Sequence, residues 1–284
     1  SQSLLFVHVE TSRSMMTKTD SWVNMLRSTA ACFAAAVGGA DAITVAPFDS
    51  ASGLSNETGL RLARNTQLIL QEETKLCSVI DPAGGSWYIE ELTDHVALSS
   101  WEIFQELERC GGLDKALLSG QWQASIAQTR DKRLEALSDR STPLTGTSEF
   151  PNLDELELER EPLPEETTAL GEKRCEPLPL FRWSAPFEQM REAAEFSSDR
   201  PLLFLANLGG IATHAARSAF AKNLFESGGI RVADNDGFDT PSACAEAFSS
   251  SGCRIACICS SNDVYSESAL EVARQLRSAG AEQI

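Results

Sequence analysis

The stretch at residues 201–229 reads PLLFLANLGGIATHAARSAFAKNLFESGG, and it decides the fold of the second half of the chain. Its first six residues form a short apolar run, which predicts a buried strand. Residues 207–213 form a glycine-containing loop, and the pattern from 214 to 227 predicts a helix that ends at Gly228-Gly229. A strand followed by a loop and a helix is the repeating unit of a parallel α/β sheet.

The same alternation continues towards the C-terminus. Further strands are predicted from residue 230 and over 254–259, and helices over 241–251 and 266–278. Three parallel strands with crossover helices predict a truncated doubly wound α/β domain. Because ligands of this architecture bind in the loops after the strands, the loop at 207–213 is the first candidate for a site.

The first half of the chain also alternates strands with helices. Strands are predicted over 4–9 and 42–45, helices over 20–37, 57–73 and 90–110, and two further helices between 113 and 139. Asp20 is the predicted N-cap of the first of these helices. Only two or three strands are visible here, which is too few to close a β/α barrel.

The composition changes between residues 149 and 176, where acidic residues and prolines replace apolar ones. This change is typical of a solvated connector rather than a binding site. The sequence therefore predicts three parts. They are an α/β part with a helical extension at 1–140, an acidic linker at 141–185 and an incomplete α/β domain at 186–284.

The composition also excludes several classes of protein. A formal net charge of −17 argues against a nucleic-acid partner, because phosphate backbones would be repelled. No apolar run reaches the roughly 20 residues needed to span a bilayer, and no basic and apolar leader opens the chain. Several cysteines, Cys32 and Cys77 among them, sit in apolar or helical stretches as reduced thiols do, which favours a cytoplasmic protein.

The two ends predict a fragment of a longer protein. The chain starts with Ser1 directly before a strand-like run, and it ends at Ile284, where another strand would begin. We expect such a fragment to fold poorly alone, because an incomplete barrel leaves strand edges and apolar faces uncovered.

Several motifs resemble those of a known family. Residues 61–73 read RLARNTQLILQEE, and residues 81–90 read DPAGGSWYIE. With AAVGGAD at 35–41, Gly111-Gly112 and GTSEF at 146–150, they resemble the later part of the methylmalonyl-CoA mutase barrel. The second half of the chain is similar to the cobalamin-binding type of domain that follows this barrel.

The resemblance implies both a fold and a function. The implied fold is a partial (β/α)8 TIM barrel followed by a truncated flavodoxin-like, Rossmann-type doubly wound domain. The implied reaction rearranges the carbon skeleton of an acyl-CoA, methylmalonyl-CoA to succinyl-CoA, with a radical supplied by adenosylcobalamin. Many bacterial members are heterodimers in which only the large subunit is active, so the implied partner is a large catalytic subunit.

The resemblance singles out His214 as a candidate cobalt ligand. In cobalamin-binding members the loop after the first strand of this domain carries Asp-x-His-x-x-Gly, whose histidine coordinates cobalt. Here His214 falls at the ligand position, but Ala212 replaces the aspartate and Arg217 the glycine. Loss of the group that orients a metal-ligating histidine typically weakens a site about 10–100-fold. His214 is therefore either a weakened cobalt ligand or, as we favour, a remnant of an ancestral site.

A second position points the same way. Catalytic large subunits of this family carry a substrate-contacting histidine in the strand after the Gly-Gly turn, and alignment from Gly38 puts Thr44 there. Threonine can donate a hydrogen bond but cannot act as an imidazole. We therefore expect no catalytic residue in this chain and no adenosylcobalamin bound by it, as in a small subunit.

Other residues have weaker claims to function. His8 and His95 have no partner at metal or triad spacing. Gly209-Gly210 is a weak candidate for a phosphate cradle. The polar residues on the helix at 57–73 either hold a CoA phosphate or support the barrel's own loops. They are Arg61, Arg64, Asn65 and Gln67.

Four cysteines of the second half raise the question of zinc. Cys257 and Cys259 point to the same face of a predicted strand, and Cys244 and Cys253 precede them. The sequence has no CxxC pair among them, so buried thiols are favoured over a zinc site.

Three hypotheses follow for the whole chain. The first is a non-catalytic small subunit that stabilises a large mutase subunit as a heterodimer. The second is an active, cobalamin-binding acyl-CoA mutase. The third is a free-standing regulatory binding module without a mutase partner. The replacements at residues 44, 212 and 217 favour the first.

Overall fold

The structure is a computed structural model that describes residues 5–156, 158–164, 174–197 and 201–284. The start of the first predicted strand and part of the predicted linker lie outside these residues. The chain divides into two compact units, and each is built from two segments. Unit 1 consists of residues 1–142 and 157–183, and unit 2 of residues 143–156 and 184–284.

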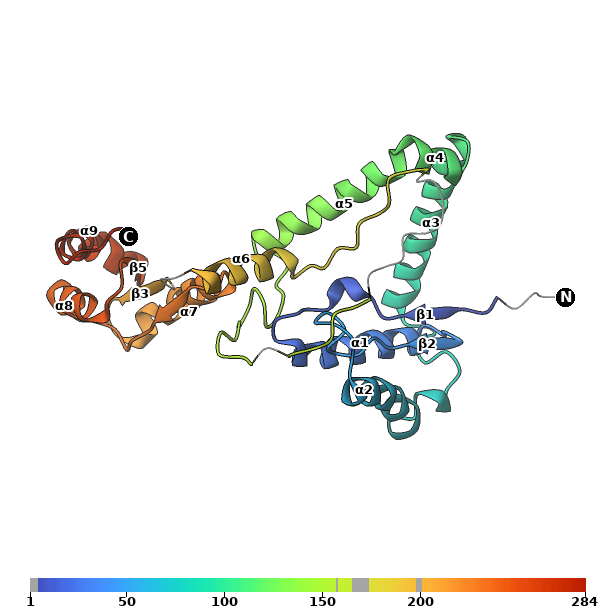
Figure 1. Cartoon of the computed structure of the whole chain (residues 1–284), viewed down its shortest axis with the longest axis horizontal. Coiled ribbons are helices and arrows are strands. Elements are labelled where there is room, and N and C mark those ends of the chain that lie inside the picture. Colours follow the sequence, from blue (N-terminus) through green and yellow to red (C-terminus); the bar gives the residue numbers. More distant parts are fainter. Residues whose placement is uncertain (1–4, 157, 165–173, 198–200) are drawn as a thin grey trace. The chain divides into compact units, whose positions relative to one another are not determined.

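Unit 1 begins with a parallel strand–helix–strand element (Figure 1). Strands β1 (His8–Glu10) and β2 (Ala42–Thr44) pair in parallel, with His8 opposite Ala42 and Glu10 opposite Thr44. The helices of this unit are α1 (Asn24–Val37), α2 (Glu57–Leu68), α3 (Trp87–Arg109), α4 (Leu113–Ser119) and α5 (Gln121–Ser138). The alternation predicted for the first half is therefore confirmed, with β1 shorter than predicted.

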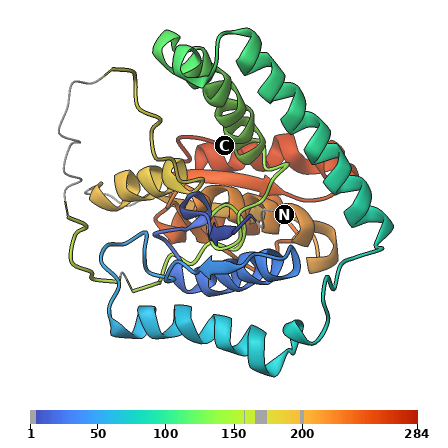
Figure 2. The ribbon, with the colours of Figure 1, turned by 90° about the vertical axis from the view of Figure 1, so that its right-hand side faces the viewer.

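Helix α1 connects the two strands and packs against a small core. Cys32 on α1, Val45 after β2 and Leu70 after α2 form this buried cluster, and α2 runs beside α1 (Figure 1 and Figure 2). The predicted cap is wrong. Asp20 has φ 45° and makes no capping hydrogen bond with its side chain, because a 3₁₀ turn over Ser21–Val23 precedes the helix.

Helix α2 begins with a side-chain cap, because the Asn56 side chain accepts a hydrogen bond from Gly59 N at 3.0 Å. The helix predicted over 57–73 is regular only as far as Leu68. A π-helical turn over Ile69–Glu73 then continues it. Such a turn widens the helix locally, so the side-chain stripe does not continue in register.

Helix α3 carries apolar side chains but buries none of its residues. Trp87 and Leu98 are among its exposed apolar residues. The helix is followed by Gly111 and Gly112, which both have positive φ (96° and 90°), a conformation that favours glycine and lets the chain turn into α4. Neither α3 nor any other described helix combines the length and the apolar composition that a membrane span requires.

Unit 2 contains a three-stranded parallel sheet with the order β4-β3-β5. The strands are β3 (Leu202–Asn207), β4 (Arg231–Ala233) and β5 (Ile255–Cys259). The helices are α6 (Ala185–Phe196), α7 (Ile211–Ser227), α8 (Pro241–Ser251) and α9 (Asn262–Ser278). The strands and helices predicted for 201–284 are confirmed to within a few residues. Helix α6 was not predicted, because the linker composition runs up to its first residue.

Helices cover both faces of the sheet of unit 2. Successive side chains of β3 point to opposite faces, so this strand contributes to the core on each side. Leu203 and Leu205 pack towards α7. Phe204 points the other way and packs with Phe248 of α8 and Val272 of α9. Burial of one such side chain contributes about 1.5–3 kcal/mol, so the central strand anchors the whole unit.

The described parts of the acidic segment form ion pairs with the folded units, so the segment is more than a solvated connector. In unit 2, Arg231 Nη2 donates to Asp154 Oδ1 at 2.5 Å, and Arg191 Nη1 donates to Glu155 Oε1 at 3.3 Å. A second part, around residue 160, forms an ion pair within unit 1. Asp154 and Glu155 are thus counter-ions for arginines of unit 2, and Arg160 is the counter-ion of a carboxylate of unit 1, which composition alone does not reveal.

Candidate functional site

The loops that follow the three strands of unit 2 lie at the carboxyl edge of the sheet. They begin at Leu208 after β3, at Asp234 after β4 and at Ser260 after β5. The chain places β4 on one side of β3 and β5 on the other, so the strand order reverses at β3. Doubly wound sheets bind ligands at such a reversal, and the predicted site residue His214 follows this point in the chain.

His214 lies near the start of α7 and is only 3% exposed. Its Nε2 lies 3.2 Å from Asp236 O. Because a carbonyl oxygen only accepts, Nε2 carries the proton and donates in this hydrogen bond. Its Nδ1 lies 3.5 Å from Ser218 Oγ, one helical turn later. Both ring nitrogens of His214 therefore face polar groups of unit 2, namely the Asp236 carbonyl and the Ser218 hydroxyl.

The loop after β4 packs closely against the imidazole. Gly237 has φ 103°, and a Cβ at this position would stand against Gly209 O and 2.9 Å from His214 Nε2. Gly209 N donates to Phe238 O at 2.9 Å, and Phe238 N donates to Asn207 O at 2.8 Å. The Gly209 amide is therefore used within the fold, which argues against the predicted phosphate cradle.

Asn207, the last residue of β3, organises the edge and is fully buried (0% exposed). Its Oδ1 accepts a hydrogen bond from Ser218 Oγ, and its Nδ2 donates to Asn235 O at 3.0 Å. Asn235 Nδ2 in turn donates to Leu205 O at 2.6 Å. Buried polar groups that satisfy one another in this way hold a site in one arrangement.

Arg217 reaches from α7 to the loop after β5. Its two terminal nitrogens donate to Ser260 O and to Asn262 Oδ1, each at 2.5 Å. Its guanidinium also lies over the Tyr265 ring, 4.7 Å from the centroid, where a cation–π contact is favourable. Arg217, which replaces the glycine of the motif, thus connects α7 to the loop after β5 by hydrogen bonds.

This arrangement does not fit ligation of cobalt by His214. A ligating imidazole presents an unprotonated nitrogen to the metal, while its other nitrogen is held by a carboxylate or a similar group. Here Nε2 is protonated towards a backbone carbonyl, and Ala212 supplies no carboxylate. The loops at the carboxyl edge of the sheet are joined by hydrogen bonds to one another, and His214 is one of the donors in this network.

In unit 1, the strand pairing brings His8 and Thr44 together. His8 Nε2 lies 2.8 Å from Thr44 Oγ1 across β1 and β2. His95, by contrast, is exposed on α3, 4.0 Å from Glu91. Thr44, the position at which the resemblance implies a histidine in catalytic subunits, thus carries a hydroxyl that is hydrogen-bonded to the His8 imidazole.

The four cysteines of unit 2 are divided between its two cores. Cys244 and Cys253 lie in the core under α8 and α9, whereas Cys257 and Cys259 lie in the core under α7. The sheet separates the two pairs, so they cannot surround one zinc ion. Within the described ranges, no group of three or more His, Cys, Asp and Glu side chains is placed to hold a metal.

Cys257 and Cys259 form a hydrogen-bonded thiol pair, with their Sγ atoms 3.9 Å apart. The hydrogen bond between them lowers the pKa of the Cys257 thiol and raises that of Cys259. The pair is packed in the core under α7, so its role in the fold is that of buried thiols.

The polar residues of α2 are divided by exposure. Arg61 and Arg64 are exposed, while Asn65 and Gln67 are half-buried. Guanidinium groups on a free surface are suited to phosphate, and half-buried amides are suited to holding neighbouring loops. Their assignment to a CoA phosphate or to barrel loops stays a prediction.

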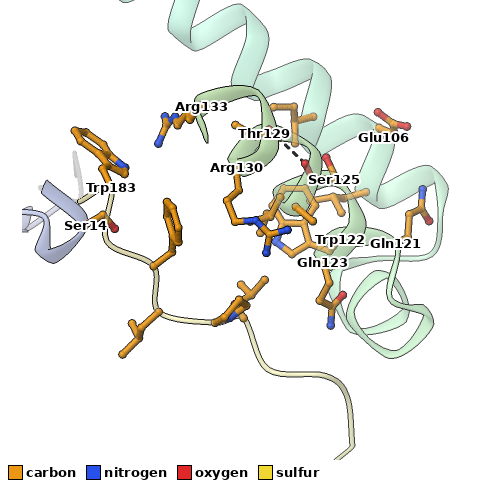
Figure 3. A pocket seen from close by; sticks show the side chains of 18 of the residues that line it. Ser14, Glu106, Gln121, Trp122, Gln123, Ser125, Thr129, Arg130, Arg133 and Trp183 are labelled. Carbon is orange, nitrogen blue, oxygen red and sulfur yellow. Dashed lines mark hydrogen bonds between the residues drawn. The ribbon is translucent and has the colours of Figure 1, made fainter. Parts of the chain in front are cut away.

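A separate cavity of about 510 Å³ lies in unit 1, between α3, α5 and the segment at 178–183 (Figure 3). Its lining is mainly apolar and includes Ile103 and Leu107 from α3 and Trp122 from α5. Arg130 and Arg133 extend from α5 at the side that faces the segment (Figure 3).

This cavity was not predicted from the sequence, although a signal for it exists. Trp122, Ile126, Arg130 and Arg133 are spaced by four, four and three residues, which places them on one face of α5. The opposite wall comes from a segment about 50 residues later in the chain. No local pattern joins that segment to α5.

The chain is similar to known proteins over most of its length. The family model described as methylmalonyl-CoA mutase matches residues 1–198. A protein of Streptomyces virginiae named methylmalonyl-CoA mutase small subunit is 48% identical over 96% of this chain and 44% of its own length. Proteins of the same name from Propionibacterium freudenreichii subsp. shermanii and Porphyromonas gingivalis are 38% and 35% identical, over 94% and 92% of this chain.

This chain therefore spans less than half the length of these relatives, between 41% and 44%. The family model and the relatives agree with the motifs at 61–73 and 81–90 that first indicated the relationship. On these grounds, the chain belongs to the methylmalonyl-CoA mutase family.

Proposed function

We propose that this chain is part of the non-catalytic small subunit of an adenosylcobalamin-dependent acyl-CoA mutase, which interconverts methylmalonyl-CoA and succinyl-CoA. The single observation that carries the proposal is the state of His214. It is buried, its Nε2 donates to Asp236 O, and its Nδ1 faces Ser218 Oγ. Because the imidazole of His214 is already hydrogen-bonded inside its own unit, we infer that the cofactor is bound by a partner subunit.

The partner in this proposal is a large catalytic mutase subunit, and the complex acts on an acyl-CoA with adenosylcobalamin. The relatives' own names speak of a small subunit, which supports a second, larger one. Thr44 supports the same division, because a hydroxyl stands where catalytic large subunits carry an imidazole. A net charge of −17 supports the absence of nucleic-acid partners. The expected cytoplasmic location stays a prediction.

The finer architecture is part of the proposal. The parallel element β1-α1-β2 supports assignment of residues 1–140 to part of a TIM barrel with a helical extension. The order β4-β3-β5, with the first strand in the centre, supports a flavodoxin-like, cobalamin-binding-like domain at 186–284. Residues 141–185 then form the linker between them.

A visible absorption titration with hydroxocobalamin tests whether this chain binds the cofactor through His214. The wild-type protein and a His214→Ala variant are compared under the same conditions. We expect both to leave the spectrum of the free cofactor unchanged. A spectral change that requires His214 would favour the alternative, an active cobalamin-binding mutase chain.

Co-purification separates the proposal from the third hypothesis, a free-standing regulatory module. A tagged form of the chain is expressed together with the catalytic subunit of the same source, and both are quantified after affinity and size-exclusion chromatography. A stable complex of equal amounts is expected. Elution of the chain alone, with full mutase activity in the other fractions, would contradict the proposal.

A further inference from the structure

The cavity between α3, α5 and the segment at 178–183 has the features of a small-molecule site. We propose that it binds an anionic amphiphile, in which a carboxylate is joined to an apolar chain. This proposal is independent of the mutase assignment, because it rests on residues that neither His214 nor Thr44 contacts.

The walls of the cavity are fastened to one another by hydrogen bonds. Gln123 Nε2 on α5 donates both to Leu117 O and to Glu176 O, each at 3.0 Å. Further along the segment, Trp183 N donates to Ser14 O at 3.0 Å. The segment is thus held near both ends. The cavity volume of about 510 Å³ lies within the usual range for small-molecule sites.

The apolar part of the lining fits a hydrocarbon chain. Ile103 and Leu107 on α3 and Ile126 on α5 contribute aliphatic side chains, and the segment adds Leu178 and Phe181. Such a surface gains free energy when water is replaced by apolar groups, at about 25 cal/mol per Å². An inorganic anion would gain nothing from these walls, which favours a ligand with an apolar body.

The charged part of the lining fits a carboxylate. Arg130 and Arg133 stand one turn apart on α5 and both reach towards the segment (Figure 3). Arg130 is held by Asp131 Oδ1, which accepts from its Nε at 2.9 Å and its Nη2 at 2.8 Å. Glu106, the acidic residue of the lining, points away from both guanidinium groups (Figure 3).

Arg133 is also placed for an anion. Its guanidinium lies over the Trp183 ring, 5.8 Å from the centroid, and this cation–π contact holds it beside the cavity. Arg133 thus places a positive charge beside the cavity in a protein of net charge −17, whereas the charge of Arg130 is balanced by Asp131. Planar guanidinium groups bind a carboxylate with paired hydrogen bonds, which the neutral analogue of the ligand cannot reproduce.

Isothermal titration calorimetry with decanoate and with its neutral analogue decanamide tests the proposal. The proteins are the full-length parent chain, its Arg133→Ala variant, and its Lys132→Ala variant as the matched control on the same helix outside the cavity lining. Far-UV circular dichroism of each protein checks that the overall helix content is unchanged. We expect the wild type and Lys132→Ala to bind decanoate about tenfold more tightly than decanamide, and Arg133→Ala to lose this preference.

Two further variants make the result specific to this cavity. Ala127→Trp adds bulk to the lining and is expected to weaken both ligands. Trp183→Phe is expected to reduce the change in tryptophan fluorescence that decanoate causes, and the remainder is expected to come from Trp122, the other tryptophan of the lining. The proposal is overturned if decanoate does not bind the wild type at about 1 mM, if both ligands bind equally, or if Ala127→Trp binds as well as the wild type.

Discussion

Arg160 Nε donates to Asp49 Oδ2 at 2.6 Å, although the two residues stand 111 positions apart in the chain. Asp49 is completely buried, and its other oxygen accepts a hydrogen bond from Ser55 Oγ at 2.6 Å. A Cβ on Gly59 would collide with the same carboxylate, so the first turn of α2 is built around it. An arginine of the acidic segment is thus the counter-ion of a carboxylate in the interior of unit 1.

Loss of this counter-ion is expected to destabilise unit 1. Arg160→Ala leaves Asp49 as a buried carboxylate without its counter-ion. We expect this substitution to lower the free energy of unfolding by about 3 kcal/mol. Urea titration followed by circular dichroism measures the difference. Glu159→Ala is the control, because its side chain is exposed and its removal is expected to cost less than about 0.5 kcal/mol. Equal effects of the two substitutions would show that the pair contributes nothing.

The closure of the sheet edge over His214 depends on a glycine. Gly237→Ala places a Cβ against Gly209 O at a φ of 103°, and we expect a loss of about 3 kcal/mol or more. Gly252→Ala is the matched control. Its φ is 72° but no atom lies within 4 Å of the added Cβ, so only the conformational cost of about 1–2 kcal/mol remains. Thermal unfolding distinguishes the two, and a smaller effect at Gly237 would contradict close packing of this loop.

The thiol of Cys244 gives unit 2 a predictable response to alkaline pH. Burial raises the pKa of this thiol from 9.0 to about 11. The unfolded chain therefore loses the proton first. The protonated thiol therefore favours the folded state of unit 2. This contribution to the free energy of unfolding is fully present below pH 9.0 and is lost as the pH rises through about 11. We expect Cys244→Ala to flatten the decline in the free energy of unfolding over this window.

Urea titrations at both ends of the window measure that decline. Alkylation with iodoacetamide, mapped by mass spectrometry, supplies a second readout in the same protein. Cys244 is expected to be labelled only after unfolding, whereas the exposed Cys110 is labelled in the folded chain. Rapid labelling of Cys244 in the folded protein would contradict its burial.

Restoring the family motif is not expected to restore a cobalt ligand. The double variant Ala212→Asp/Arg217→Gly recreates Asp-x-His-x-x-Gly, but His214 stays under the loop that contains Gly237. We expect no change in the spectrum of added hydroxocobalamin. We also expect a loss of about 2 kcal/mol or more, because Arg217 gives up two hydrogen bonds and its contact with Tyr265. A His214-dependent spectral shift in this variant would show that the motif alone controls binding.

The sequence predicted the parts of the fold that local patterns control. Residues 202–207 form a strand because six successive residues suit a buried β conformation, and the glycine pair at 228–229 ends α7 as predicted. The cap at Asp20 failed because the tertiary structure inserts a 3₁₀ turn after it. Helix α6 was missed because its composition merges with that of the linker.

The candidate site was predicted only in part, since its decisive contacts are long-range. The replacements at 212 and 217 indicated a weakened motif, but not that Arg217 would bind the loop after β5. Nor does any spacing along the chain join residue 160 to Asp49, or the segment at 178–183 to Arg133. Such pairs are chosen by packing between distant segments, which one sequence does not display.

The division of the acidic segment between the two units has a consequence for limited proteolysis. The chain passes from one unit to the other at 142–143, again at 156–157 and again at 183–184. A protease that cuts one of these crossings leaves the other two intact. Each cut divides the chain into separate fragments, but the ion pairs Asp154–Arg231 and Arg160–Asp49 help to hold the two segments of each unit together. The units then stay tethered through an uncut crossing, and only cleavage at every crossing releases them.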